Sequence, residues 1–237
     1  MKPFILRMPD LSKRSHDKEL LDDPDIPFDD IRQNMQELNT VNALLGGHAV
    51  TLKGFRQLLG NRKQVSVCEI GCGGGDNLYV IGKWCKQHNI NAKLTGIDIN
   101  PHCIAFAKER YKEAGIGFIC SDYRNAVLKE PQDIIFNALF CHHFTDEGVT
   151  GILSWMHKNA ALGFFINDLH RHVFAYYNIK WLTRMFSDSY LVKNDAPLSV
   201  LKSFRKQEWT RLVNAAGIDN VKISWEWAFR YLIVGRK

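Results

Sequence analysis

Long hydrophobic runs are absent from the 237-residue sequence, and no stretch of about 18 apolar residues is available for a membrane-spanning helix. The short apolar run after Lys2 turns polar at Asp10, which is too soon for a secretory signal peptide. Internal repeats and low-complexity tracts are also missing, which excludes collagen-like and largely disordered proteins. We therefore expect a folded cytoplasmic protein without a membrane span.

Closely spaced cysteines are a second absence. The sequence has six cysteines, and no two of them form a CxxC pair. Zinc sites usually use close Cys and His ligands, and secreted disulfide scaffolds are smaller and richer in cysteine. The sequence therefore predicts reduced thiols in a protein core, no metal site and a reducing compartment.

Basic clusters are a third absence, although the formal net charge is +6. Lys and Arg are scattered among acidic residues, whereas nucleic-acid-binding proteins usually carry a basic patch. The 46% hydrophobic and 24% charged residues are ordinary for a globular protein. We expect no nucleic-acid partner, and the sequence leaves the oligomeric state open.

From Asn61 onward, the sequence alternates between strand-like and helix-like segments. Continuous apolar runs predict strands at residues 65–70, 93–99, 117–120, 133–139 and 163–167. Helical spacing predicts helices near residues 78–85 and at 101–114, 146–162 and 206–216. The runs 221–227 and 230–234 are too close for a helical crossover, so they should form an antiparallel hairpin. The predicted fold is α/β and Rossmann-like: a doubly wound, mostly parallel seven-stranded sheet with an antiparallel C-terminal strand.

Two further helical regions flank this pattern. Residues 28–59 read as two helices interrupted at Gly46 and Gly47, so residues 1–60 should form a helical cap rather than an independent domain. Residues 61–237 should form the main domain, with a helical insertion on the substrate side at about 173–204. We expect the cap and the aromatic-rich insertion to cover the open edge of the sheet.

The loop after the first predicted strand carries the strongest chemical signal. Glycines at 71, 73 and 75 allow a sharp turn and a close approach of the backbone to a ligand. Glu69 stands in a buried strand, where a carboxylate needs donors, and it suits a cationic amino acid. Asp98 ends the second strand, where a carboxylate can accept both hydroxyls of a ribose. Asp122 follows the third strand, where it can accept an adenine amino group beside Tyr123.

These motifs resemble those of class I S-adenosylmethionine-dependent methyltransferases. The run from Glu69 to Gly75 is similar to their first motif, and residues 96–99, 121–123 and 133–137 are similar to the next three. The segment that ends in His142-His143-Phe144 resembles the ubiquinone/menaquinone-biosynthesis type of small-molecule methyltransferase. The resemblance implies that residues 61–237 are a methyltransferase domain and that the cofactor is S-adenosylmethionine, with S-adenosylhomocysteine as product. The implied cofactor residues are Glu69, Gly71, Cys72, Gly73, Asn77, Asp98, Ile99, Asp122, Tyr123, Asn137 and Ala138.

Polar residues after the fourth and fifth strands are the candidates for the acceptor side. Both loops leave the same edge of a parallel sheet, so their side chains should converge beside the methyl donor. His142 or His143 is predicted as the base, and Asp168 should orient a histidine or the acceptor. His170, Arg171 and Tyr177 are predicted to bind the acceptor, which we expect to be phenolic, quinone-like or polyketide-like. Capping or mutual pairing of Asp168 and Arg171 is an equally open role.

Two other functions remain possible from the sequence. The glycine loop and Asp98 also permit an NAD(P)-dependent oxidoreductase, but Glu69 and the C-terminal hairpin disfavour it. An RNA or protein methyltransferase is the other alternative. Enzymes that methylate flipped bases commonly have a polar-Pro-Pro-aromatic run after the fourth strand, and this chain has Asn137-Ala138-Leu139-Phe140 there.

Overall fold

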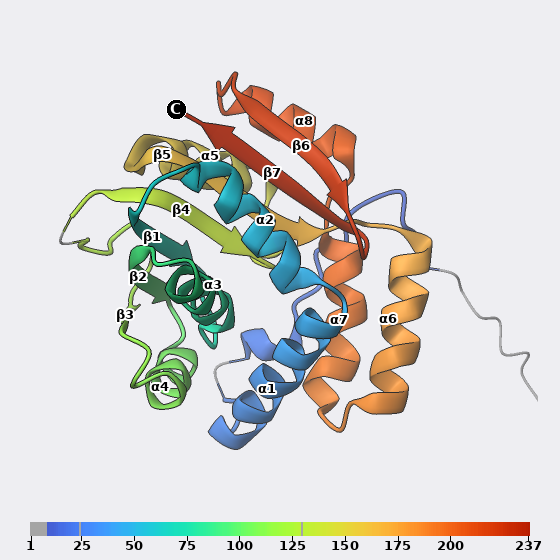
Figure 1. Ribbon diagram of the computed structural model, residues 1–237. Coiled ribbons are helices and arrows are strands. Elements are labelled where there is room, and N and C mark those ends of the chain that lie inside the picture. Colours follow the sequence, from blue (N-terminus) through green and yellow to red (C-terminus); the bar gives the residue numbers. More distant parts are fainter. Residues whose placement is uncertain (1–8, 24, 129) are drawn as a thin grey trace, which may run out of the picture.

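A seven-stranded sheet forms the centre of the computed structural model, which describes residues 9–23, 25–128 and 130–237 (Figure 1). The strands lie in the order β3-β2-β1-β4-β5-β7-β6. Their bounds are β1 Gln64–Ile70, β2 Asn91–Asp98, β3 Ile116–Cys120, β4 Gln132–Ala138, β5 Ala160–Leu169, β6 Val221–Glu226 and β7 Arg230–Arg236. The first five strands pair in parallel, and β7 runs antiparallel to both of its neighbours, β5 and β6. This topology confirms the predicted fold class.

Helices cover both faces of the sheet. One face packs against α2 (Gly47–Leu59), α3 (Asp76–Gln87) and α4 (Pro101–Arg110), and the other against α5 (Asp146–Asn159) and α8 (Lys206–Ala215). On the first face, Phe136 and Phe165 stack with ring centroids 4.6 Å apart. Because both faces are buried, the central strands are apolar along nearly their whole length.

Local sequence signals explain where several helices begin. Asn100 accepts hydrogen bonds from the backbone N–H groups of His102 and Cys103, and Pro101 follows it, which is a favourable start for α4. Thr145 caps α5 in the same way through the backbone N–H of Gly148. The predicted extension of α5 to Leu162 was wrong. Residues from Ala160 onward are already extended because Ala160 pairs with Gln132 of β4.

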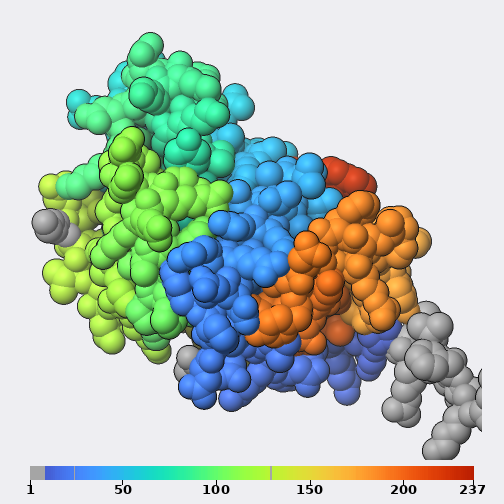
Figure 2. Space-filling view, turned by 90° about the horizontal axis from the view of Figure 1, so that it is seen from below, coloured from blue at the N-terminus to red at the C-terminus, as the bar shows by residue number. Residues whose placement is uncertain are grey.

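Three helices and a short strap lie beyond the carboxyl ends of the strands. These are α1 (Phe28–Leu44), α6 (Val173–Phe186), α7 (Tyr190–Lys202) and the strap, which we define as residues 9–23, including the short helix η1 (Leu20–Asp22). In Figure 2 the blue N-terminal residues lie between the green residues of the sheet's first half and the orange residues of α6 and α7. Within the described ranges, every helix is too short or too polar to cross a membrane.

Candidate functional site

A cavity of about 950 Å³ opens at the carboxyl ends of the central strands. The loops after β1, β2 and β4 form one side of it, and α1, α6, α7 and the strap form the other. This is the edge at which ligands bind in open α/β sheets. The predicted cofactor residues near β1 and the histidines after β4 therefore open into one space.

The glycine loop after β1 needs glycine for steric and conformational reasons. Gly71 has a positive φ of +67°, and a Cβ atom there would lie only 2.1 Å from Cδ2 of Phe140. Gly73 has a φ of +48°, and its backbone N–H donates to Oδ2 of Asp98 at 2.8 Å. The loop therefore presents backbone to the cavity, with a carboxylate holding it in place.

Two carboxylates face this loop, Glu69, which is buried, and Asp98, which is half-buried. Burial raises the pKa of Asp98, whose oxygens accept backbone hydrogen bonds from Gly73 and Asn100, both at 2.8 Å. Burial also raises the pKa of Glu69 well above its ordinary value. Glu69 Oε1 accepts from the Asn77 amide at 3.0 Å, and its Oε2 has no partner among the described residues. A buried oxygen without a donor suits a cationic ligand group at this point.

Most of the predicted cofactor residues line the cavity. The structure places these in its wall: Glu69, Gly71, Cys72, Gly73, Asn77, Asp98, Ile99 and Ala138. Asp122, Tyr123 and Asn137 lie outside it. The Asp122 carboxylate binds Arg124, and the Tyr123 ring packs edge-on against Trp155. Asn137 is fully buried, and its side-chain oxygen accepts from the Cys141 thiol.

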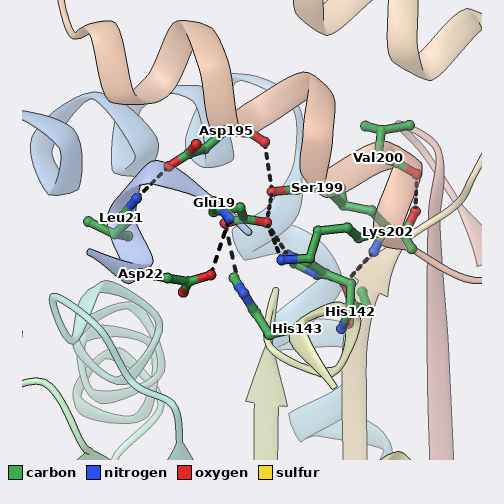
Figure 3. A network of polar contacts seen from close by, with 12 residues as sticks. Glu19, Leu21, Asp22, His142, His143, Asp195, Ser199, Val200 and Lys202 are labelled. Atoms are coloured by element: carbon green, nitrogen blue, oxygen red, sulfur yellow. Dashed lines mark hydrogen bonds and ion pairs between the residues drawn. The ribbon is translucent and has the colours of Figure 1, made fainter. Parts of the chain in front are cut away.

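The acceptor-side cluster is built around His142, on the short helix η2 (Cys141–His143) (Figure 3). Asp168, at the end of β5, holds this residue twice. Its Oδ1 lies 2.7 Å from His142 Nδ1, and its Oδ2 accepts the His142 backbone N–H at 3.1 Å. This pairing fixes the ring and leaves Nε2 facing the cavity. Asp168 itself lies behind the histidine and does not line the cavity.

Glu19 of the strap completes the cluster, and sequence analysis did not identify it. Its carboxylate lies 3.8 Å from Nε2 of both His142 and His143. It also accepts from the Ser199 hydroxyl at 2.9 Å and pairs with the Lys202 ammonium at 3.2 Å. Figure 3 shows the carboxylate between the two imidazoles and α7. Glu19 is remote in sequence from every motif, so only the tertiary structure identifies it.

The two histidines have opposite pKa shifts. Burial disfavours a charge on His142, but the carboxylates of Asp168 and Glu19 outweigh burial and raise its pKa. Burial and the positive charge of His142 lower the pKa of His143 well below its ordinary value. The shifts therefore favour the charged form of His142, beside two carboxylates, and the neutral form of His143, which can accept a proton.

The strap is fixed to the rest of the molecule by polar contacts. Arg14 donates to the backbone oxygens of Lys202, His142 and Phe144 and forms an ion pair with Asp146. The backbone N–H groups of residues 20 and 21 donate to the Asp195 carboxylate of α7, at 2.8 and 3.0 Å. These contacts hold Glu19 against the histidines.

The three residues predicted to bind the acceptor do not line the cavity. Arg171 is buried, and its guanidinium donates to the backbone oxygens of Leu11 and Ser203 and to Glu208. His170 bonds through its backbone to Phe229, and burial lowers the pKa of its imidazole to about 4. The ring of Tyr177 packs edge-on against Tyr176. From the inserted helices, the residues that reach the cavity are Ala175, Asn178, Ile179, Trp181, Leu182, Ala196, Ser199 and Val200.

Glu19, His142 and His143 also offer three possible metal-ligand atoms within 4.8 Å of one another. Sequence analysis predicted no metal site. Asp168 orients the first histidine as a second carboxylate often does at metal centres. The Lys202 ammonium, however, already supplies a positive charge to Glu19 and would oppose a divalent cation. The arrangement suits proton transfer without a metal.

Comparisons with known proteins agree with the fold. Residues 67–161 match the family model described as a methyltransferase domain. Malonyl-[acyl-carrier protein] O-methyltransferase of Acetivibrio thermocellus is 28% identical over 39% of this chain and 31% of its own length. The Anoxybacillus flavithermus protein of that name is 38% identical over 32% of this chain and 28% of its own. The matches thus span less than a third of these relatives.

Solved structures extend the similarity over nearly the whole chain. The plantazolicin methyltransferase BpumL in complex with SAH superposes with a TM-score of 0.66, at 20% identity, over 92% of both chains. Human N-acetylserotonin methyltransferase in complex with SAM has a TM-score of 0.62, at 19% identity, over 89% of this chain and 56% of its own. The family match and the shared fold confirm the predicted resemblance to class I methyltransferases.

Proposed function

We propose that this chain, a class I methyltransferase by fold and by its match over residues 67–161, transfers the methyl group of S-adenosylmethionine to a small organic acceptor. One observation carries the proposal: the glycine loop with its two carboxylates and the carboxylate-bound histidine pair open into the same cavity. A donor site and a proton-accepting site side by side are what methyl transfer to an ionisable group requires.

The donor side takes the cofactor at the loop after β1. Asp98 accepts the ribose hydroxyls, and Glu69 faces the ammonium of the methionyl group, directly or through water. Burial alone favours the protonated form of Glu69. A cationic ligand group beside it would favour the ionised carboxylate, because opposite charges attract. Gly73 leaves room for the cofactor next to the backbone, because the nearest atom to a Cβ there is the Met35 sulfur at 3.7 Å.

The acceptor side aligns the nucleophile and removes its proton. The attacking atom of the acceptor would form a bond to the methyl carbon while the carbon–sulfur bond breaks. The two electrons of the broken carbon–sulfur bond would go to sulfur and neutralise the sulfonium. The acceptor's proton passes to Nε2 of His143, which is neutral at physiological pH. The Glu19 carboxylate, 3.8 Å from that nitrogen, balances the charge that His143 gains, and Asp168 fixes the neighbouring His142 ring. Alignment and exclusion of water supply roughly 7–11 kcal/mol in such reactions.

The proposed acceptor is apolar, with a phenolic, quinone-like or polyketide-like core. Aliphatic and aromatic side chains from α1, α6, α7 and the β6–β7 turn form most of the acceptor side of the cavity wall. The names of the relatives give malonyl-[acyl-carrier protein], plantazolicin and N-acetylserotonin, so methyltransferases of this fold are named for a range of organic acceptors. An RNA or protein acceptor remains the alternative outcome of an acceptor screen.

Cofactor binding tests the proposal most directly. Calorimetry should show binding of S-adenosylhomocysteine and none of NADH, and Gly73→Leu should abolish it. Gly151→Leu is the matched control, because a side chain there meets no atom within 4 Å. Tight binding of NADH would exclude the proposed activity, and so would a failure to bind either NADH or S-adenosylhomocysteine. A screen of phenols, quinones, polyketide-like acids, RNA and peptides with radiolabelled S-adenosylmethionine then identifies the acceptor.

A further inference from the structure

Arg230 is a buried charge that lacks a counter-ion. It begins β7, is 3% exposed and lines the cavity. Its Nη2 donates to the side-chain oxygen of Asn42 at 2.9 Å, whereas Nε and Nη1 have no partner among the described residues. Across the same part of the chain, no carboxylate lies within ion-pair distance of it. The guanidinium therefore lies buried at the cavity wall with two of its three nitrogens unpaired among the described residues.

Arg171 shows how this protein satisfies a buried guanidinium when the residue is structural. It is 1% exposed, and all three of its nitrogens have partners, one of them the Glu208 carboxylate. Arg230 is equally buried, and burial lowers its pKa to about 10, so it remains charged at neutral pH. Unpaired buried charges are strongly unfavourable. The unpaired guanidinium nitrogens therefore suit an anionic ligand group.

The position of Arg230 places it on the acceptor side of the cavity. Its strand is separated from β1 by β4 and β5, which at about 4.8 Å per strand puts it roughly 14 Å from the glycine-loop strand. Arg230 pairs across the sheet with Leu169, and the apolar residues Leu45 and Phe229 line the cavity near it. The nearby Asp168 carboxylate is already committed to His142.

We propose that Arg230 binds a carboxylate, or a similarly flat oxyanion, carried by the acceptor. A guanidinium pairs with such groups through two parallel hydrogen bonds, which fixes orientation as well as charge. This inference rests on the proposed function in one respect, that the molecule bound at Arg230 is the methyl acceptor. It describes a molecule with an anionic group at Arg230, an apolar body against α6 and α7, and a reacting group at the histidines.

The test compares two probes of matched size and shape, the anionic 2-naphthoate and the neutral 2-naphthamide, by calorimetry on the full chain. The wild-type protein should bind the carboxylate at least tenfold more tightly than the amide. Arg230→Met should abolish that preference, and Arg230→Lys should retain part of it. The cofactor also carries a carboxylate, so it is the competing candidate for the anion at Arg230. If the acceptor supplies the anion instead, the affinity for S-adenosylhomocysteine should stay within threefold in both variants.

Three results would overturn the proposal: no preference for the carboxylate in the wild type, an unchanged preference in Arg230→Met, or a tenfold loss of S-adenosylhomocysteine affinity in that variant. A melting temperature distinguishes a structural role. Arg230→Met removes an uncompensated charge and should melt at the same or a higher temperature, whereas a large drop with no effect on probe binding would contradict the assignment. The probes bind or fail independently of methyl transfer, so failure of the proposed function is seen separately, in the S-adenosylhomocysteine titration.

Discussion

Among single residues, Asp98 makes the sharpest prediction. Its carboxylate holds the Gly73 backbone and is the proposed acceptor of the ribose hydroxyls. Asp98→Ala should weaken S-adenosylhomocysteine binding by about 10- to 100-fold, since hydrogen bonds to a charged group are worth roughly 1.5–3 kcal/mol. Titration calorimetry measures the change, with Glu130→Ala, an exposed carboxylate paired with Lys93, as the control. Wild-type affinity in Asp98→Ala would contradict the ribose assignment.

The histidine pair predicts a particular pH profile. His143→Ala should lower the single-turnover rate by about 10²–10⁴ if proton removal limits it. A base needs its neutral form, so the lowered pKa of His143 places the acidic limb of the wild-type profile below the ordinary histidine value of about 6.5. His142→Ala removes the adjacent positive charge, so the pKa of His143 should rise and the limb should move to higher pH.

The measurement is the single-turnover rate against pH in both variants, with cofactor affinity checked separately. A wild-type limb that persists unchanged in both would exclude these histidines as the base.

Sequence alone could predict several residues of the cavity wall because their signals are local. Glu69, Gly71, Gly73 and Asp98 lie at strand ends, and a strand end in a parallel sheet has a known position relative to the ligand. Glu19 and Arg230 have no such local signal. Glu19 is important because it lies beside the two imidazoles, and Arg230 because it lies in the cavity wall. Arg171 shows the converse, because its loop position suggested a ligand and its actual partners are internal.

At the level of elements, the strap is the segment with the most direct consequence for activity. Deleting residues 1–27 should leave the sheet and cofactor binding intact but impair turnover, because the carboxylate of Glu19 leaves the histidines. Glu19→Gln, which keeps the strap, is the matched comparison. Equal losses in rate would assign the effect to that carboxylate, and a larger loss in the deletion would assign the rest to coverage of the cavity. Unchanged kinetics in the deletion would dismiss both roles.

Regular elements were predicted well, and their exceptions have physical causes. Hydrophobic periodicity located the strands and helices because each buries a defined face. The end of α5 was misplaced because pairing of Ala160 with β4 overrides the helical pattern of the local sequence. The sequence contains no pattern that predicts the path of the strap, because its polar contacts, such as those of Arg14 with backbone oxygens, depend on distant segments.

For the whole molecule, the cap and the sheet should unfold together. Phe55 and Leu58 of α2 belong to the same core as Phe136 of β4, and a Cβ at Gly54 would approach the Phe165 ring to 2.6 Å. Scanning calorimetry should therefore show one transition. Gly54→Leu should lower its temperature as a whole, since overpacking costs about 1–3 kcal/mol, whereas Gly151→Leu should change it little. A separate early transition for residues 28–59 would contradict a shared core.

The strap also affects the order in which the protein acquires its parts during synthesis. Glu19 and Ser199 are separated by 180 residues, and Ser15 donates its backbone N–H to Leu201. Contacts between residues this far apart in sequence form late, because the entropy of closing the long loop is lost before the contact stabilises the chain. A nascent chain that has emerged only as far as β4 contains the glycine loop but neither α7 nor a docked strap. The proposed donor site can thus form before the proposed acceptor site, and the two histidines gain the Glu19 carboxylate only when α7 has left the ribosome.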